Sequence, residues 1–268
     1  MVQNKKIVAK KTIKKSAKKV VKKIVKKVVK KTTKKVSKKS TKPKKTHVAI
    51  ILDKSSSMHS IRNETISSFN EQVKSIKNAA NPDTFITLTL FSDEVVIHKF
   101  AESLDNLKEF TAEDYRPSGS TAMYDAIGMT VERMKKEIDD INDPNTAVLC
   151  VIITDGQENA SRTWHGNDIS ALVKGLTGTK RWTFSVLGAN IDLAGLADAI
   201  GIHASNMAKF AATSQGILRG TNVTTSSLGR YFMARNSADD LVEASLSSNF
   251  YNANGNAVTD TTIEPDKK

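Results

Sequence analysis

The hydrophobic positions after Thr46 follow two alternating patterns. Short runs of consecutive apolar residues indicate strands, and apolar residues three or four positions apart indicate helices between them. The apolar runs predict strands over 47–53, 84–91, 95–100, 147–154, 181–188 and 206–210. The helical spacing predicts helices over 61–76, 123–138, 168–176, 194–200 and 213–233.

Two features of this pattern predict the architecture. Only the turn "SDE" separates 84–91 from 95–100, so these two strands should form an antiparallel hairpin. The run 147–154 is the most apolar in the chain, so this strand should lie centrally with both faces covered. The alternation of strands and helices predicts an α/β fold: a doubly wound, mostly parallel central sheet with one antiparallel edge strand and helices on both faces.

The first 45 residues have a different pattern. From Val8 to about Thr41, two lysines alternate with two other residues. On a helix the apolar pairs would rotate by about 40° per repeat, so no lasting face could pack on a core. Crowded lysines and weak helix formers further oppose a helix. We therefore expect a disordered arm over 1–45, a folded domain over 46–235 and a polar, disordered tail over 236–268.

The charge is as unevenly distributed as the hydrophobicity. Residues 1–45 contain 21 Lys and no Arg, Asp or Glu. The remaining residues hold 20 basic against 28 acidic side chains, a net charge of −8, although the whole chain carries +13. A polycationic arm on a mildly acidic body indicates that the arm has a partner of its own.

Nucleic acid is the partner that the arm favours, because lysines displace counterions from a phosphate backbone whatever its sequence. The arm lacks Arg and aromatic residues, which argues against base reading or stacking. It resembles the lysine-rich tails of linker histones and of bacterial histone-like proteins. The alternatives are an anionic membrane or acidic protein, and a solubilising tail without a partner. The candidate nucleic-acid-binding residues are Lys18, Lys19, Lys22, Lys23, Lys26, Lys27, Lys30 and Lys31.

Cysteine content and the lengths of apolar runs bear on the compartment. The single cysteine, Cys150, lies in the most apolar run and cannot form an internal disulfide, so we expect a buried, inert thiol. The N-terminus has no apolar secretory segment, and the longest apolar run, 147–153, is too short to span a membrane. We therefore expect a cytoplasmic protein, and the arm's preference for nucleic acid makes nucleoid association an option.

Two strand ends carry the candidate chemistry. Asp53 ends the first strand within "HVAIILDKSSSMHSI", and Asp155 ends a later one within "VIITDG". Ligands of such sheets bind at the carboxyl ends of strands where the strand order reverses, so the two carboxylates would face each other if these strands are neighbours. A third loop, "PSGSTAMYDA", adds Gly119, Ser120 and Thr121.

This set contains only oxygen donors, which suits a hard divalent cation: Mg²⁺ first, then Mn²⁺ or Ca²⁺. The i, i+2, i+4 spacing of Asp53, Ser55 and Ser57 lets one turning loop present all three to one point. Neutral hydroxyls leave part of the ion's charge uncompensated. The ion would therefore attract a carboxylate from another protein.

Taken together, "DKSSS", Thr121 and "TDG" resemble the metal-ion-dependent adhesion site of von Willebrand factor A domains, and the resemblance extends over 46–235. The segments "FNEQV", "RPSGSTAMYDAIG", "TDGQENAS" and "FSVLGAN" are similar to stand-alone intracellular members from bacteria and phages. The chain departs from the family pattern at Lys54 and Ser56, the two variable positions of the motif, where many relatives have glycine at one or both. The resemblance implies a Rossmann-like fold. It also implies direct metal contacts from Ser55, Ser57 and Thr121, and contacts from Asp53 and Asp155 either directly or through water.

Other interpretations of these side chains stay open. Ser55 and Ser57 are also suited to capping the following helix. Asp125 is expected in the first turn of its helix, where the helix dipole favours it. Glu158 and Asn159 are candidates for lining the docking surface.

We expect binding rather than catalysis. An aspartyl-phosphate enzyme would have an acid where Ser55 lies, Asp53 has no evident acid–base partner, and no glycine-rich phosphate loop is present. The expected function is that of an adaptor, whose body docks an exposed Asp or Glu of a partner protein through Mg²⁺ while the arm binds nucleic acid. The alternatives are a histone-like compacting protein with a merely structural body, and a Mg²⁺-dependent phosphohydrolase.

Overall fold

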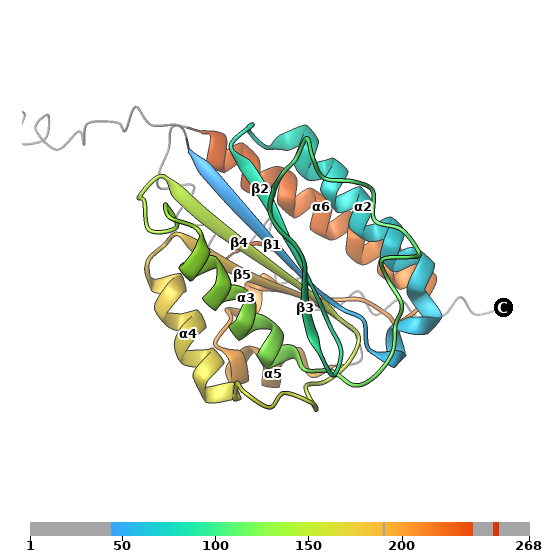
Figure 1. Cartoon of the computed structure of the whole chain (residues 1–268). Coiled ribbons are helices and arrows are strands. Elements are labelled where there is room, and N and C mark those ends of the chain that lie inside the picture. The colour runs from blue at the N-terminus through green and yellow to red at the C-terminus, as the bar shows by residue number, and fades with distance from the viewer. Residues whose placement is uncertain (1–43, 190, 238–248, 252–268) are drawn as a thin grey trace, which may run out of the picture. The chain divides into compact units, whose positions relative to one another are not determined.

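A six-stranded sheet runs through the centre of the fold, with helices on both faces (Figure 1). The computed structural model describes residues 44–189, 191–237 and 249–251. The lysine repeat, for which the sequence predicts disorder, lies outside these residues, as does most of 236–268. In the part of the chain that is described, no helix is both long and apolar enough to cross a membrane.

The strands confirm the predicted α/β architecture. The sheet has the order β3-β2-β1-β4-β5-β6, so the strand order reverses between β1 and β4. Every neighbouring pair is parallel except β2 and β3, which form the predicted antiparallel hairpin. The strands are β1 (Lys45–Asp53), β2 (Thr84–Phe91), β3 (Val95–Ser103), β4 (Thr146–Thr154), β5 (Trp182–Gly188) and β6 (Met207–Lys209).

The predicted helices are confirmed, with ends that shift by a few residues. The helix predicted from residue 61 is preceded by a 3₁₀ helix, η1. Its buried residues Met58 and Ile61 are three positions apart, so both point to one side of a helix with three residues per turn. The helices are η1 (Ser56–Ile61), α2 (Arg62–Ala79), α3 (Met123–Glu137), α4 (Gly166–Gly178), α5 (Leu193–Ile200), η2 (Ala204–Asn206) and α6 (Ser214–Asn236).

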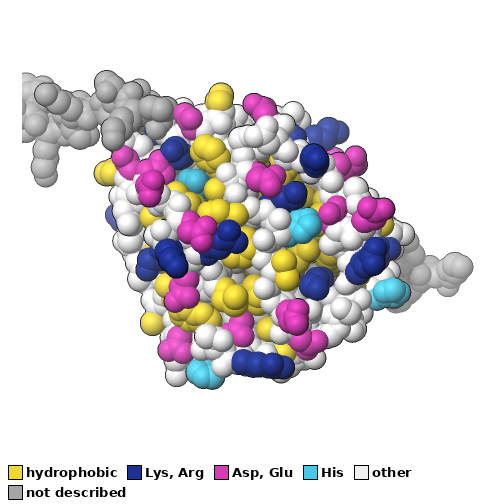
Figure 2. Space-filling model, in the orientation of Figure 1, with side chains coloured by type: hydrophobic (Ala, Val, Ile, Leu, Met, Phe, Trp, Pro, Cys, Tyr) yellow, Lys and Arg dark blue, Asp and Glu magenta, His cyan; other side chains and the backbone are white. Residues whose placement is uncertain are grey.

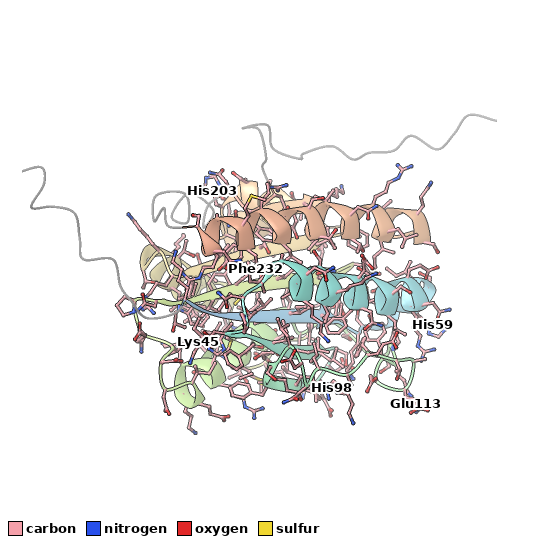
Figure 3. The ribbon with its side chains drawn as sticks, turned by 90° about the horizontal axis from the view of Figure 1, so that it is seen from above. Lys45, His59, His98, Glu113, His203 and Phe232 are labelled. Atoms are coloured by element: carbon pink, nitrogen blue, oxygen red, sulfur yellow. The ribbon has the colours of Figure 1, made fainter. Side chains whose placement is uncertain are left out.

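The sheet divides the hydrophobic core into two layers. Successive residues of β1 point to opposite faces, so Ile50 and Leu52 pack in the layer of α2 and α6, and Ala49 and Ile51 in the layer of α3, α4 and α5. Figure 3 shows α2 and α6 together on one side of the sheet, with Phe232 of α6 in the same layer. Every residue of β4 is buried, which confirms its predicted central position.

Three residues beyond α6 differ from the expectation for 236–268. Phe250 and Tyr251 are buried, and the backbone N–H of Phe250 donates to Asn206 Oδ1 at 2.8 Å. The N–H of Tyr251 donates to the carbonyl oxygen of Ser205 at 3.1 Å. Residues 249–251 therefore contact the folded body, and the disorder expected for the rest of 236–268 stays a prediction. Two adjacent aromatic residues in a polar segment have no periodicity, so only the surface that receives them reveals their packing.

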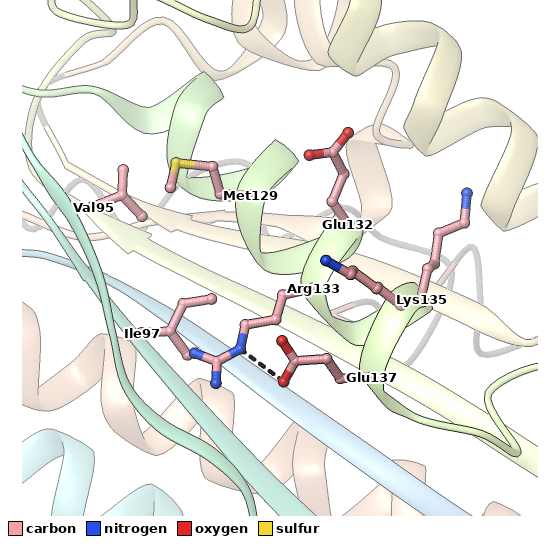
Figure 4. Close-up of a pocket in the computed structure, with 8 residues that line it drawn as sticks. Val95, Ile97, Met129, Glu132, Arg133, Lys135 and Glu137 are labelled. Atoms are coloured by element: carbon pink, nitrogen blue, oxygen red, sulfur yellow. Dashed lines mark hydrogen bonds and ion pairs between the residues drawn. The ribbon is translucent and has the colours of Figure 1, made fainter.

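The surface between β3 and α3 is hollowed into a groove. Figure 2 shows apolar side chains among scattered charged ones on this face, and Figure 4 shows the groove in close-up. It has a volume of about 780 Å³ and is lined by Val95, Ile97 and Met129, among others. Arg133 pairs with Glu137 at 3.1 Å on its rim. None of the predicted metal-site residues lines this groove.

Candidate metal centre

Two neighbouring strands bring the predicted carboxylates to one end of the sheet. Asp53 is the last residue of β1, and Asp155 directly follows β4. The two strands pair in parallel from Lys45 to Leu52 of β1, so both acids leave the sheet at the same end. In Figure 3, His59 lies toward this end of the sheet and Lys45 lies at the opposite end of β1.

Hydroxyl groups link the two carboxylates. Ser57 Oγ donates to Asp155 Oδ1 at 2.5 Å, and it lies 3.0 Å from Ser55 Oγ. The backbone N–H of Ser55 donates to Asp53 Oδ1 at 2.7 Å. Two side-chain hydrogen bonds and one backbone N–H therefore connect these four residues into one group.

Thr121 joins this group from the loop that precedes α3. A Cβ atom placed on Gly156 would lie 3.1 Å from Thr121 Oγ1 and 3.8 Å from Ser57 Oγ. The two hydroxyls thus face the same point, and the glycine of "TDG" leaves that point open. The structure therefore brings together all five oxygen-bearing residues singled out from the sequence. Gly156, whose missing side chain opens the site, is not among those predicted residues.

Two further residues hold Asp53 in place. Thr154 Oγ1 donates to Asp53 Oδ2 at 2.6 Å, and the hydroxyl of Tyr115 donates to the carbonyl oxygen of Asp53 at 2.5 Å. Thr154 is the first residue of the "TDG" motif, so its place beside Asp155 is a signal that sequence reasoning could have used. Tyr115 lies in the loop between β3 and α3, and no local pattern relates it to Asp53.

The two carboxylates are buried without a basic partner. Asp53 is 0% exposed and Asp155 is 4% exposed, and neither forms an ion pair with a basic side chain in the described ranges. Burial raises the pKa of Asp53 to about 6, although hydrogen bonds from Thr154 and Ser55 oppose the rise; the charge of Asp155 adds to it. Burial also raises the pKa of Asp155. A bound cation would supply the missing positive charge.

The donor set fits a hard divalent cation, because it consists of carboxylate and hydroxyl oxygens. In the described residues, no group of three or more His, Cys, Asp or Glu side chains could hold a metal ion, so an ion here would rely on hydroxyl oxygens beside the two carboxylates. Ser55 precedes η1, but its side chain makes no capping hydrogen bond to that helix. Its hydroxyl instead pairs with Ser57, so the geometry favours a ligand role over a capping role.

The acids at the rim of the site have structural contacts. Asp125 lies in the first turn of α3, as predicted, and accepts hydrogen bonds from the backbone N–H groups of residues 162–164 at 2.7–3.0 Å. Glu158 and Asn159 are the candidates for the docking surface. Asn159 accepts the backbone N–H of Thr121, just before α3, and Glu158 accepts that of Tyr124 in its first turn, both at 2.8 Å. These side chains fix the β4–α4 loop against α3.

Several solved structures of other proteins are similar to this chain. The PilB minor pilin from Streptococcus sanguinis is 12% identical, with a TM-score of 0.51, over 71% of this chain and 62% of that chain. The manganese-loaded TRAP protein of Plasmodium vivax is 16% identical, with a TM-score of 0.48, over 63% of this chain and 69% of that chain. Proximal thread matrix protein 1 from the mussel byssus, solved with a zinc-occupied MIDAS motif, is 15% identical, with a TM-score of 0.48. That match covers 68% of this chain and only 45% of the mussel protein.

The family comparison covers more than half of the chain. No curated protein matches the sequence. Residues 47–215 match the family described as von Willebrand factor type A domain. The matched range contains β1 except for its first two residues, β2 to β6, and all five oxygen-bearing residues of the site. This protein therefore belongs to the von Willebrand factor type A domain family.

Proposed function

We propose that this protein is a metal-dependent adaptor, whose folded body docks an exposed Asp or Glu side chain of a partner protein onto a bound divalent cation. We propose Mg²⁺ as the ion, with Mn²⁺ and Ca²⁺ as alternatives, because hard oxygen ligands suit all three. The observation that carries the proposal is the convergence, at the carboxyl ends of β1 and β4, of oxygen atoms from Asp53, Ser55, Ser57, Thr121 and Asp155.

The number and charge of the donors support docking at the ion. Mg²⁺ prefers octahedral coordination, and five donor residues leave a position for water or for an oxygen atom of a partner. Both oxygens of Asp53 already accept hydrogen bonds, from Ser55 and Thr154, so this carboxylate suits contact through water. The three hydroxyls add no negative charge. A carboxylate from outside is therefore a strong ligand for the open position.

The contacts of the site support binding rather than catalysis. The hydroxyls of Ser55 and Ser57 bond to each other and to Asp155, and neither bonds to a histidine side chain in the described ranges. Cys150 is buried in β4, and burial raises the pKa of its thiol, which suits an inert core cysteine and not a nucleophile. The rival phosphohydrolase function predicts Mg²⁺-dependent turnover of a phosphate ester that Asp53→Asn abolishes.

We further propose that the lysine-rich arm binds nucleic acid without sequence preference. Its 21 lysines and lack of acidic residues support this role, because polycations bind phosphate backbones by releasing counterions. An arm of this kind acts where nucleic acid is present, so we propose an intracellular location. The rival histone-like function predicts DNA compaction that Asp53→Asn leaves intact.

Calorimetry with Mg²⁺ tests the metal centre directly. We expect the full chain to take up one ion, and Ser57→Ala to weaken uptake about tenfold or more. Ser56→Ala is the matched control, because Ser56 is exposed between the two candidate ligands and only its backbone N–H bonds to the site loops. Absence of Mg²⁺ and Mn²⁺ uptake by the wild type, or equal losses in both variants, would refute the proposal.

A pull-down from the native source tests the docking step. Nuclease-treated extract is passed over the immobilised full chain in Mg²⁺ and then eluted with EDTA. We expect a partner protein to be retained by the wild type, released by EDTA and absent from the Asp53→Asn eluate. Nucleic acid, in extract without nuclease, should be retained despite EDTA and released by salt. Retention that survives both EDTA and Asp53→Asn would contradict docking through the ion.

A further inference from the structure

A second hollow opens beside the metal centre. It has a volume of about 350 Å³ and lies between the start of α3, the β4–α4 loop and α5. Gly156 belongs to both sites: it lines the hollow, and a Cβ atom on it would meet Thr121 Oγ1 of the metal centre at 3.1 Å. We call this hollow the side pocket. The side pocket therefore lies next to the position that a partner residue docked at the ion would occupy.

Apolar and polar side chains both line the side pocket. Met123 and Ile191 are buried beneath it, and Leu196 of α5 is half-buried at its side. Its volume is at the lower end of the range of about 300–1,000 Å³ found for ligand pockets. The side pocket is therefore suited to one long side chain with an apolar stem.

The rim of the side pocket is acidic. Asp192 and Glu158 line it, and no Lys, Arg or His is among the described residues that do. Asp192 Oδ1 accepts the N–H of Ala194 at 3.1 Å, but within the described ranges Oδ2 accepts no hydrogen bond. The charge of Glu158, after burial, contributes to a raised pKa of Tyr124 in the wall. Negative potential therefore reaches the side pocket, with no basic side chain in its lining to offset it.

We infer that the side pocket binds a Lys or Arg side chain of the partner, next to the acidic residue held at the ion. The aliphatic stem would pack on the apolar part of the lining while the cationic head lies at Asp192. Glu158, whose carboxylate already accepts four hydrogen bonds, adds its negative charge. The partner would thus present an acidic and a basic residue close together, matching the cation and the acidic rim in turn. This inference rests on the docking function proposed above.

Immobilised peptides test the inference with the full chain in Mg²⁺. Each peptide has one Asp in a Gly-Ser background, with Lys, Leu or Glu placed at each nearby position in turn. We expect the wild type to prefer Lys over Glu and Leu at one or a few positions. Asp192→Asn keeps an acceptor for the N-terminus of α5 and should reduce that preference about two- to fivefold, as for a partly exposed ion pair. Asp198→Asn, exposed on α5 outside the side pocket, is the matched control and should leave the preference unchanged.

The outcomes separate this inference from the docking proposal. Capture that needs Mg²⁺ and Asp53 but shows no preference for Lys overturns the side-pocket inference alone. The same holds for a Lys preference that survives Asp192→Asn. Capture independent of Mg²⁺ and Asp53, or no capture of any peptide, overturns both. The cationic arm attracts acidic peptides in every variant equally, so it cannot imitate a preference for Lys.

Discussion

A buried carboxylate at Asp53 should have two effects: it destabilises the metal-free fold, and it gives the site affinity for a cation. Replacing Asp53 with Asn separates these effects. Asp53 is 0% exposed, and its oxygens accept the Ser55 N–H at 2.7 Å and the Thr154 hydroxyl at 2.6 Å. Asn keeps an acceptor for Ser55 and presents an amide donor that the oxygen of Thr154 accepts. The substitution therefore removes the charge with little change of shape.

The magnitude follows from the raised pKa of Asp53. The difference between the ordinary carboxyl value of 3.8 and about 6 corresponds to about 3 kcal/mol. Because the folded pKa is raised, the ionised carboxylate destabilises the metal-free fold at pH 7. This penalty shrinks as the pH falls below about 6 and disappears below 3.8. We expect metal-free Asp53→Asn to be more stable than the metal-free wild type at pH 7, by about 1–3 kcal/mol.

Thermal and denaturant unfolding in EDTA and in Mg²⁺ measure both effects. Free Mg²⁺ at about 100 times its Kd should stabilise the wild type by about 2.7 kcal/mol and should leave Asp53→Asn unchanged. Asp105→Asn, an exposed acid in a turn, controls for the removal of a negative charge and should change neither value. A metal-free Asn variant that is less stable than the wild type at pH 7 would refute the claim that the buried charge is uncompensated.

Three other predictions concern the fold, the loop of Thr121 and the arm. His47 is buried, and burial lowers its pKa from 6.5 to about 4, so its contribution to stability is complete above pH 6.5 and is lost as the pH falls towards 4. As the pH falls across this range, the free energy of unfolding, measured with urea, should decrease by up to about 3 kcal/mol less in His47→Phe than in the wild type. Gly119 has a φ of +77°, and a Cβ on it would lie 2.0 Å from Asp93 Oδ2, so Gly119→Ala should cost about 1–2 kcal/mol and weaken Mg²⁺ uptake in calorimetry. Asp93→Ala should relieve the clash but not the backbone strain; full recovery in the double variant would contradict a strained backbone. Deleting residues 1–42 should make the slope of log K for DNA binding against log salt concentration less steep, by about 0.7–0.9 for each phosphate that the arm neutralises. An unchanged slope in filter binding would rule out the arm as the DNA-binding segment.

The secondary structure was readable from the sequence where the local pattern is unambiguous. The strand 147–154 has no charged side chain to face solvent, so its central position as β4 follows from burial on both sides. The turn "SDE" likewise leaves no room for a crossover between β2 and β3. The 3₁₀ helix η1 and the buried pair Phe250 and Tyr251 escaped prediction, because each depends on the surface that receives it and not on a repeating pattern.

The candidate site also has one part that the sequence predicts and another that only the structure shows. Asp53, Ser55 and Ser57 lie within five consecutive residues, so their shared direction is a property of one turn. The support of Asp53 by Tyr115 joins residues 62 positions apart, and Ser57 meets Asp155 across 98 positions. Contacts of that kind leave no trace in local periodicity.

By itself, the sequence determined which side chains end the strands, the class of fold and the hard-oxygen chemistry of the candidate ligands. Only the tertiary structure decided that β1 and β4 are neighbours, that Gly156 keeps the space between two hydroxyls open, and that a side pocket with acidic residues on its rim adjoins it. The physical reason is that strand order and loop packing arise from the burial of the whole sheet between its helices. No short segment encodes that burial, although every residue of the core contributes to it.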